Sequence, residues 1–283
     1  MIIVENLSKV YQNNKQALSN INIQIDNGMF GLIGSNGAGK TTLMRILATL
    51  LYPTTGRVQI FGHDISTPEG KKYIKSILGY LPQTTSVHLN LTIEQNLDYF
   101  AILKGIKDRT TRKVHVERAL EQTGLTQLRQ DRANTLSGGM KRRLGIAITL
   151  LNNPRLIIVD EPTSGLDPAE RVRFRNVLFD LAGERIVILS THIIEDVQQV
   201  CSNLAVIKGG RLLFYGSSSE LIDQYIGKVW AISANNFNHN DYEHVVTSII
   251  TEQGKEYRVV SDNPLFKVPV LCNQPWKKPT YLL

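Results

Sequence analysis

Residues 34–42 carry the residue types that bind phosphate. They are Gly34, Ser35, Asn36, Gly37, Ala38, Gly39, Lys40, Thr41 and Thr42, which follow the phosphate-loop pattern of glycine, four residues, then Gly-Lys-Ser/Thr. Glycines let successive backbone N–H groups point at one anion. Lys40 can then reach the β- and γ-phosphates of a nucleotide, and the Thr41 hydroxyl can ligate Mg²⁺. The loop alone predicts a nucleoside triphosphatase of unspecified kind.

A pair of adjacent carboxylates, Asp160 and Glu161, follows the apolar run 156–159. Ligands of open α/β sheets bind at the carboxyl ends of strands. Asp160 is suited to the Mg²⁺ shell, and Glu161 to polarising the attacking water. An acid pair at a strand end is about as often a solvated turn, so these roles depend on the neighbouring loop and on the resemblance given below.

A second anion site is predicted in the stretch 135–143, which reads Thr-Leu-Ser-Gly-Gly-Met-Lys-Arg-Arg. Ser137 can cap the helix that follows it. With Gly138 and Gly139 it offers a hydroxyl and backbone N–H groups at a helix N-terminus, where anions bind. Taken in isolation, the same residues are more often a plain helix cap.

The stretch 135–143 lies between the phosphate loop and the acid pair. With this order along the chain, the three elements resemble the ATP-binding-cassette (ABC) ATPases, and 135–143 resembles their signature motif. The resemblance covers residues 1 to about 215 and implies further roles. Tyr11 would stack on adenine, Gln83 would contact Mg²⁺ and the attacking water, and His192 would lie at the γ-phosphate. Asp167, in the stretch 164–167, would meet the opposite subunit. A lone Tyr or His at such places is more often structural.

One residue departs from the family pattern. Many members carry Gln where this chain has Met140. Methionine cannot donate a hydrogen bond, so any polar contact made there is lost. Ser137 and Gly139 remain, and we expect activity to persist.

The elements that must position these residues are predicted from hydrophobic patterning. Apolar runs at 29–33, 156–159 and 186–189 have the unalternating look of parallel strands buried on both faces. Leu43, Ile46, Leu47 and Leu50 predict a helix after the phosphate loop, ended by Tyr52-Pro53. A hairpin with a glycine turn is expected at 204–214. A capping box at 92–95 and helices near 110–123 and 141–151 predict a helical insertion over about 86–152.

The expected fold is therefore α/β: a P-loop NTPase core, with a parallel sheet flanked by helices and an antiparallel β portion, and a helical subdomain inserted into it. We expect an ATPase domain over 1–219 and a small α+β extension of unknown role over 220–283. Within the extension the sequence suggests strands at 228–234, 256–261 and 265–272, and a helix near 242–252.

Composition and charge exclude several other classes of protein. With 283 residues, 42% hydrophobic and 20% charged, the chain is not a disordered or collagen-like sequence. No apolar run approaches the ~18–20 residues that span a bilayer. Two cysteines cannot build a disulfide framework. The net charge of +7 favours anionic partners without choosing among nucleotide, lipid headgroups and nucleic acid.

The resemblance implies an ATP-hydrolysing transporter subunit, most like those of bacterial exporters with separately encoded membrane subunits. ATP and Mg²⁺ would bind between two cassettes facing head to tail, as a homodimer or a heterodimer. The chain would work at the cytoplasmic face of the cell membrane, on a separate transmembrane permease subunit, with no specific nucleic acid as partner. The alternative is a soluble ABC-type ATPase acting on the ribosome or on nucleic acid. Such proteins of translation usually carry two cassettes in one chain, and those of chromosome organisation need a long coiled coil between their motifs.

Overall fold

A computed structural model describes residues 1–84, 87–163, 166–224, 229–233, 245–251 and 254–260. The chain divides into two compact units, Met1–Tyr215 and Gly216–Leu283. Every nucleotide-site residue expected from the sequence falls in the first unit. The two units are described separately below.

An antiparallel sheet forms the first layer of Met1–Tyr215. Its strand order is β2-β1-β4-β5, with bounds Gln16–Ile25, Ile2–Val10, Thr55–Ile60 and His63–Asp64. Ile21, Ile23 and Ile25 of β2 are buried and the residues between them are exposed. This period of two is typical of a sheet with one face on the core and one in water. The sheet is the antiparallel portion expected from the sequence.

A six-stranded sheet forms the second layer. Its order is β10-β9-β3-β8-β7-β6, with bounds Arg211–Ser217, Asn203–Lys208, Gly28–Ile33, Ile186–Thr191, Leu156–Asp160 and Leu78–Leu81. The pairs β9/β3, β3/β8, β8/β7 and β7/β6 are parallel. Every residue of β7 and β8 is buried, which confirms the strands predicted from the unalternating runs. The hairpin at 204–214 is also confirmed.

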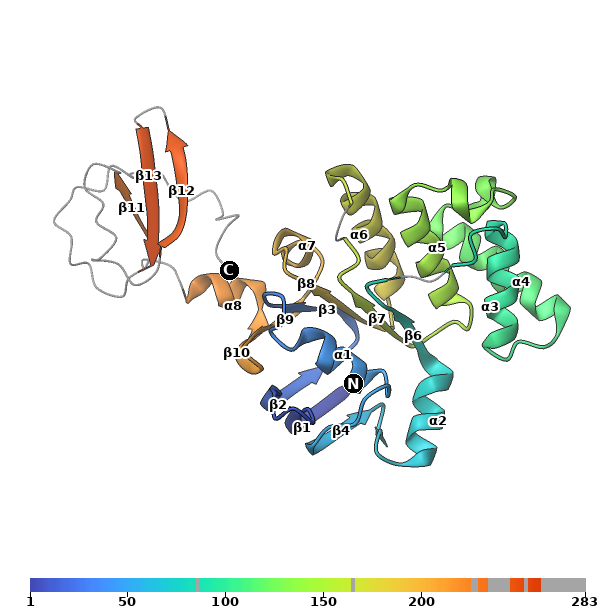
Figure 1. Cartoon of the computed structure of the whole chain (residues 1–283), viewed down its shortest axis with the longest axis horizontal. Coiled ribbons are helices and arrows are strands. Elements are labelled where there is room, and N and C mark those ends of the chain that lie inside the picture. The colour runs from blue at the N-terminus through green and yellow to red at the C-terminus, as the bar shows by residue number, and fades with distance from the viewer. Residues whose placement is uncertain (85–86, 164–165, 225–228, 234–244, 252–253, 261–283) are drawn as a thin grey trace. The chain divides into compact units, whose positions relative to one another are not determined.

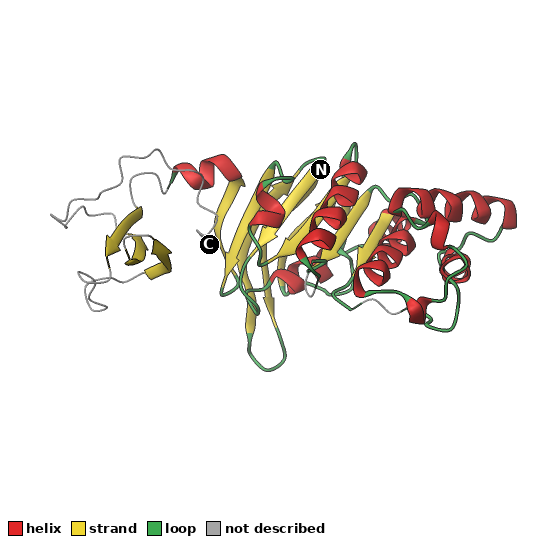
Figure 2. Cartoon of the chain, turned by 90° about the horizontal axis from the view of Figure 1, so that it is seen from above, coloured by secondary structure: helices red, strands yellow, loops and turns green. Residues whose placement is uncertain are grey.

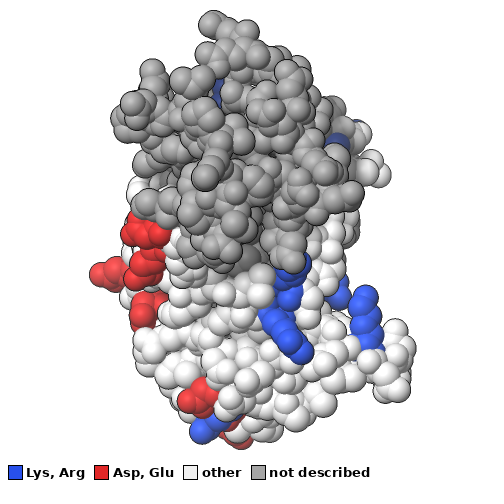
Figure 3. Space-filling view, turned by 90° about the vertical axis from the view of Figure 1, so that its left-hand side faces the viewer, with Lys and Arg blue, Asp and Glu red and all other residues white. Residues whose placement is uncertain are grey.

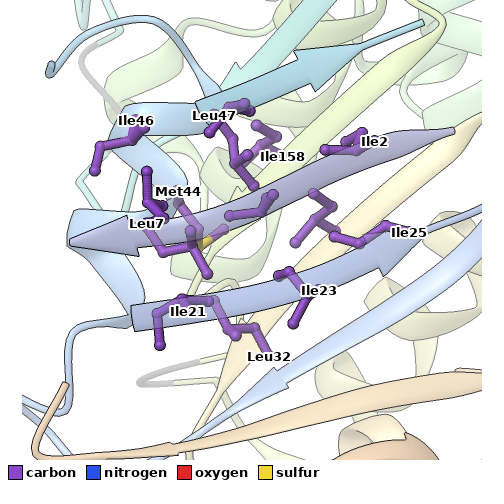
Figure 4. Close-up of a cluster of buried hydrophobic side chains, with 14 of the residues drawn as sticks. Ile2, Leu7, Ile21, Ile23, Ile25, Leu32, Met44, Ile46, Leu47 and Ile158 are labelled. Atoms are coloured by element: carbon purple, nitrogen blue, oxygen red, sulfur yellow. The ribbon is translucent and has the colours of Figure 1, made fainter. Parts of the chain in front are cut away.

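The core between the two sheets is shown in Figure 4. Side chains of β1 and β2 meet those of α1 (Lys40–Leu47) and of the parallel strands, including Leu32 and Ile158. Met44, Ile46 and Leu47 of α1 are fully buried. The helix that begins at the phosphate loop is thereby fixed on both sheets.

Helix α1 is shorter than the sequence pattern predicts. It ends at Leu47, Ala48 caps it, and Thr49 has a left-handed φ of +58°. Leu50 is 61% exposed, so its inclusion in the buried helical stripe was wrong. The turn at Thr49 rotates Leu50 away from the face that Leu43 and Leu47 share.

Helices α3, α4 and α5 lie together at one side of the strands, beyond β6 (Figures 1 and 2). Their bounds are Ile93–Leu103, Arg109–Thr123 and Gly138–Leu150, with 3₁₀ turns at Thr126–Leu128 and Ala133–Thr135. The capping box of Thr92 and Gln95 is present. These helices share a separate hydrophobic core that includes Leu97, Leu120 and Leu144. The helical insertion is therefore confirmed as a subdomain with its own core.

Three further helices belong to this unit: α2 (Pro68–Ile77), α6 (Pro168–Ala182) and α7 (Glu195–Gln198). Asp167 caps α6 by accepting a hydrogen bond from Glu170 N at 2.9 Å. No helix of the described residues is long and apolar enough to cross a bilayer. In the described part of the face in Figure 3, Lys and Arg side chains lie in separate small groups rather than in one patch.

The second unit contains α8 (Ser218–Asp223) and a sheet of order β11-β13-β12, with bounds Val229–Ser233, Gly254–Val260 and Val245–Thr251. The strands expected at 228–234 and 256–261 are confirmed in their described parts. The helix expected near 242–252 was wrong, because 245–251 is a strand. Six of the seven residues of β12 (VVTSIIT) are β-branched, and β-branched side chains favour strands. The strand expected at 265–272 lies outside the described residues.

Candidate functional site: a nucleotide pocket at the sheet edge

The phosphate loop connects β3 to α1, as the sequence predicts. Gly37 and Gly39 have positive φ angles of +82° and +114°, a backbone conformation open to glycine at low cost. A Cβ on Gly39 would come within 2.6 Å of the Ala17 carbonyl oxygen. Glycine is therefore required at this position by both torsion and space.

Lys40 lies beneath this loop and is 4% exposed. Its Nζ donates to the carbonyl oxygens of Gly34 at 2.7 Å and Ser35 at 3.2 Å. It also forms an ion pair with Glu161 Oε1 at 3.1 Å. The ammonium is thus bound by the loop itself and by a carboxylate from a different strand.

Glu161 follows β7 and has a left-handed φ of +46°. Its carboxylate contacts two of the expected site residues, since Oε1 pairs with Lys40 and Oε2 lies 3.0 Å from Nδ1 of His192. His192 follows directly after β8, the strand beside β7. The structure therefore brings Lys40, Glu161 and His192 together from three segments far apart in sequence.

Asp160, the last residue of β7, is 1% exposed. Its Oδ1 accepts a hydrogen bond from Ser190 Oγ at 2.6 Å. Ser190 Oγ in turn accepts the backbone N–H of Glu161 at 3.0 Å. One serine hydroxyl therefore holds both members of the acid pair, a role that sequence reasoning missed because the stretch 190–192 was read only for its histidine.

An open pocket of about 570 Å³ lies over the loop, within the usual size of small-molecule sites. Of the expected residues it is lined by Tyr11, Asn36, Gly37, Ala38, Gly39, Lys40, Thr41, Thr42, Gln83 and Glu161. Tyr11 Oη is 3.2 Å from Thr42 Oγ1. Lys15, Gln16, Ala17, Gly209 and Gly210 line it too and were not expected.

The glycine turn at 209–210 is part of this pocket for a steric reason. Gly210 N donates to Ala38 O at 2.9 Å, and Gly210 O accepts from Ser19 N at 2.8 Å. A Cβ on Gly210 would come within 2.7 Å of Ala17 O. The hairpin turn therefore packs its backbone on the phosphate loop, and its two adjacent glycines were the sequence signal for a close approach.

The signature residues are placed elsewhere. Ser137 caps α5 by accepting a hydrogen bond from Met140 N at 3.2 Å. Ser137, Gly138, Gly139 and Asp167 are not among the residues that line the pocket of their own chain. Ser164 and Gly165, which belong to the loop expected to meet an opposite subunit, lie outside the described residues.

The family model described as ABC transporter matches residues 18–164, about half of the chain and including both the phosphate loop and the acid pair. The chain belongs to the ABC transporter ATP-binding family. It is an ATP-hydrolysing cassette, and the expected P-loop NTPase fold and ATPase activity are confirmed.

Relatives among known proteins are of similar kind. An uncharacterised ABC transporter ATP-binding protein, YxlF of Bacillus subtilis, is 34% identical over 82% of this chain and 76% of its own length. The Nod factor export ATP-binding protein I of Rhizobium sp. (strain N33) is 36% identical over 70% of this chain and 64% of its own. Relatives of the A family are longer, and this cassette spans 9% to 30% of them.

Solved structures agree. The cassette cbiO1 of Clostridium perfringens, part of the ABC transporter complex cbiONQ, has a TM-score of 0.73 and 29% identity, covering 79% of this chain and 90% of its own. The cassette MJ0796, a dimer in a post-hydrolysis state bound to ADP and Pi, has a TM-score of 0.68 and 26% identity, covering 77% and 98%.

Proposed function

We propose that this cassette is the motor subunit of an exporter, working on a separately encoded permease subunit at the cytoplasmic face of the cell membrane. The contact of Lys40, Glu161 and His192 at the phosphate loop is the observation that carries the ATPase part of the proposal. The likeness to a Nod factor export protein supports export. The likeness to cbiO1, part of a transporter complex, supports a separate membrane partner.

At the site, in the pocket and directly beside it, each expected residue receives a role. The loop residues Gly34 to Thr42 bind the phosphates through backbone N–H groups, and Lys40 supplies a positive charge. Glu161 orients and polarises the attacking water, and His192 contacts the γ-phosphate. Tyr11, at the pocket wall beside Thr42, stacks on adenine.

The residues present also suit a magnesium ion. The Thr41 hydroxyl, the Gln83 amide and the Asp160 carboxylate are all oxygen donors, which Mg²⁺ prefers. Thr41 and Gln83 line the pocket, and Asp160 Oδ1 is oriented by Ser190. We propose that these three residues hold the ion, directly or through water. When bound, it would neutralise charge between the β- and γ-phosphates.

For the second half of the site we propose the signature residues of a partner cassette. Ser137, Gly138 and Gly139 form the N-terminus of α5, where hydroxyl and N–H groups suit an anion. They do not line their own chain's pocket, and the related MJ0796 structure is a dimer. Two cassettes, alike or different, would therefore enclose ATP head to tail, with the loop of Asp167 at the interface.

A mixing experiment tests this arrangement. Ser137→Arg should leave ATP binding by the single cassette nearly intact but block closure, because the arginine places bulk and charge in the gap. Lys40→Ala should lose tight ATP binding. Mixing the two variants should restore one functional site per mixed dimer, made of the Lys40 of one chain and the Ser137 of the other.

ATPase activity is measured against mixing ratio, with mixed dimers verified by differential tagging. Activity above either variant alone supports a shared site. If mixed dimers form but no activity returns at any ratio, the proposal that one intact site shared by two chains can hydrolyse ATP is contradicted. Ser219 is an exposed residue at the start of α8. Ser219→Arg is therefore a control for added charge, and it should leave the activity of every mixture unchanged.

The membrane partner is tested by co-purification. The tagged cassette should be recovered from detergent-solubilised membranes together with an integral membrane protein. Recovery with ribosomes or nucleic acid in its place would contradict the proposed transport role.

We further propose that nucleotide chemistry resides in 1–219 and that 220–283 is dispensable for it. The residues that line the pocket all lie at or before Gly210. A chain ending near Gly216 should still bind ATP. Loss of binding in a demonstrably folded truncation would overturn this boundary.

A further inference from the structure

Arg142, in the first half of α5, binds two separate segments of the nucleotide site. Its Nη1 donates to the carbonyl oxygens of Pro82, at 3.4 Å, and of Gln83. Its Nε donates to Pro162 O at 3.1 Å, and its Nη2 donates to Glu161 O at 3.0 Å. All four acceptors are backbone carbonyl oxygens, so these hydrogen bonds hold the main chain of the two segments rather than their side chains.

These two segments are neighbours because of the sheet. Residues 82–83 follow β6 and residues 161–162 follow β7, and the two strands are parallel with Leu81 opposite Val159. Both segments leave the sheet at the carboxyl ends of their strands, where their carbonyl groups no longer pair with a neighbouring strand. A planar guanidinium with five N–H donors can bridge two such segments. Arg142 is half-buried, and this burial lowers the pKa of its guanidinium.

The bridge bears on Glu161 in particular. Its φ of +46° is unfavourable for a residue with a side chain. The peptide groups on either side hold it there, because its N–H bonds to Ser190 Oγ and Ser190 O and its carbonyl accepts from Arg142. This conformation turns the carboxylate toward Lys40 and His192.

We propose that Arg142 is a positioning residue, which fixes the Gln83 loop and the Glu161 main chain on the signature helix. The motif that begins at Ser137, the Gln83 loop and the Glu161 carboxylate then keep one relative geometry. A displacement of α5 by nucleotide on the partner cassette would be carried to the chain's own water-activating residue. The inference rests on the proposed roles of Glu161 and Ser137.

The experiment compares Arg142→Ala and Arg142→Lys with the parent cassette. Both should bind ATP within about twofold of the parent, because Arg142 does not line the pocket. The turnover number should fall at least tenfold in both, with KM nearly unchanged, since a lysine cannot span both segments. Arg129→Ala is the matched control. It removes another guanidinium of the helical subdomain, one paired with Glu94 and Glu117, and should keep parental turnover.

Folding is measured by circular dichroism and thermal unfolding at the assay temperature. If turnover falls only in proportion to the folded fraction, Arg142 is structural and the inference is wrong. A folded Arg142→Lys cassette with the parental turnover number also overturns it. Should Arg142→Ala not fold, Arg142→Lys alone decides.

A second background separates this inference from the proposed function. In Glu161→Gln chains, Arg142→Ala should lower the residual turnover by much less than the tenfold expected in the parent, because the carboxylate is gone and only the contact with the Gln83 loop remains. If Glu161→Gln itself turns over at the parental rate, the proposed role of Glu161 fails. If Glu161→Gln is inactive but Arg142→Ala keeps parental turnover, only the present inference fails.

Discussion

Replacing Glu161 by Gln probes the centre of the site. The Glu161 side chain is 8% exposed and that of Lys40 is 4% exposed. Their charged atoms are 3.1 Å apart, where the Coulombic attraction is about 5 kcal/mol for an effective dielectric constant of about 20. Desolvation offsets part of that attraction. Breaking a buried pair from one side costs about 3–5 kcal/mol.

We expect the lower end of that range in the nucleotide-free cassette. Lys40 keeps its hydrogen bonds to Gly34 O and Ser35 O in the variant, and glutamine can still accept one from it. The free energy of unfolding should therefore fall by about 3 kcal/mol. Turnover should fall at least about a hundredfold, the contribution of a general base.

Nucleotide should reverse much of the loss of stability, because the phosphates replace Glu161 as the anionic partner of Lys40. If the difference in unfolding free energy shrinks from about 3 to about 1 kcal/mol at saturating nucleotide, linkage requires the variant to bind it about 30-fold more tightly. An ATP-induced dimer should then accumulate.

The assay is urea unfolding with and without a non-hydrolysable ATP analogue and Mg²⁺, together with calorimetric titration and phosphate release. Glu117→Gln is the control, since this carboxylate also pairs with a cation, Arg129, but is 41% exposed. It should cost about 1 kcal/mol or less and leave turnover unchanged. Parental turnover in Glu161→Gln would refute the role of Glu161. Unchanged nucleotide affinity would refute the competition for Lys40.

Three further outcomes are expected. Lys40→Ala should weaken ATP binding by about 10- to 100-fold, the value of a charge-assisted hydrogen bond, as measured by calorimetry. Burial lowers the pKa of Lys104 to about 8, below its unfolded value of about 10.4. The unfolded chain therefore binds more protons between these values and stability rises with pH across about 8 to 10.4, a rise that unfolding curves of Lys104→Met should lack. Thr163→Val should destabilise by about 2 kcal/mol or more in urea unfolding, because Asp196, 3% exposed, loses the hydroxyl bonded to its Oδ2, and Thr163→Ser should restore stability.

The parts of the site that could be predicted from the sequence are those whose residues are close together in the chain. The phosphate loop carries its strand, its glycines and its helix within about 20 residues, so pattern and context agree. Ser190 and Arg142 were missed for the opposite reason. Their partners lie 29 and 30 residues away for Ser190 and up to 60 residues away for Arg142, and only the parallel order of β6, β7 and β8 brings them together.

The second unit shows where periodicity misleads. The stretch 242–252 has apolar residues at spacings that suit a helix, yet 245–251 pairs with 254–260 as strands. The β-branched side chains and the pairing with a neighbouring strand favour a strand here, although the spacing of the apolar residues favours a helix. In the first unit, Leu50 is a smaller case of the same kind, since the spacing continued while the backbone had already turned at Thr49.

Charge explains why the expected site residues are gathered in this way. Lys40 is buried against Glu161, and Asp160, the residue before Glu161, is also buried. The half-buried guanidinium of Arg142 is a second cation at this place and interacts electrostatically with Asp160. A triphosphate brings more negative charge to the same place and competes with Glu161 for Lys40. Under the proposed function, Mg²⁺ held by Asp160 and the helix N-terminus of a partner's signature motif would each add positive charge to the closed site. We therefore propose that a second cassette supplies positive potential that the pocket of one cassette does not hold, since Ser137, Gly138 and Gly139 do not line it.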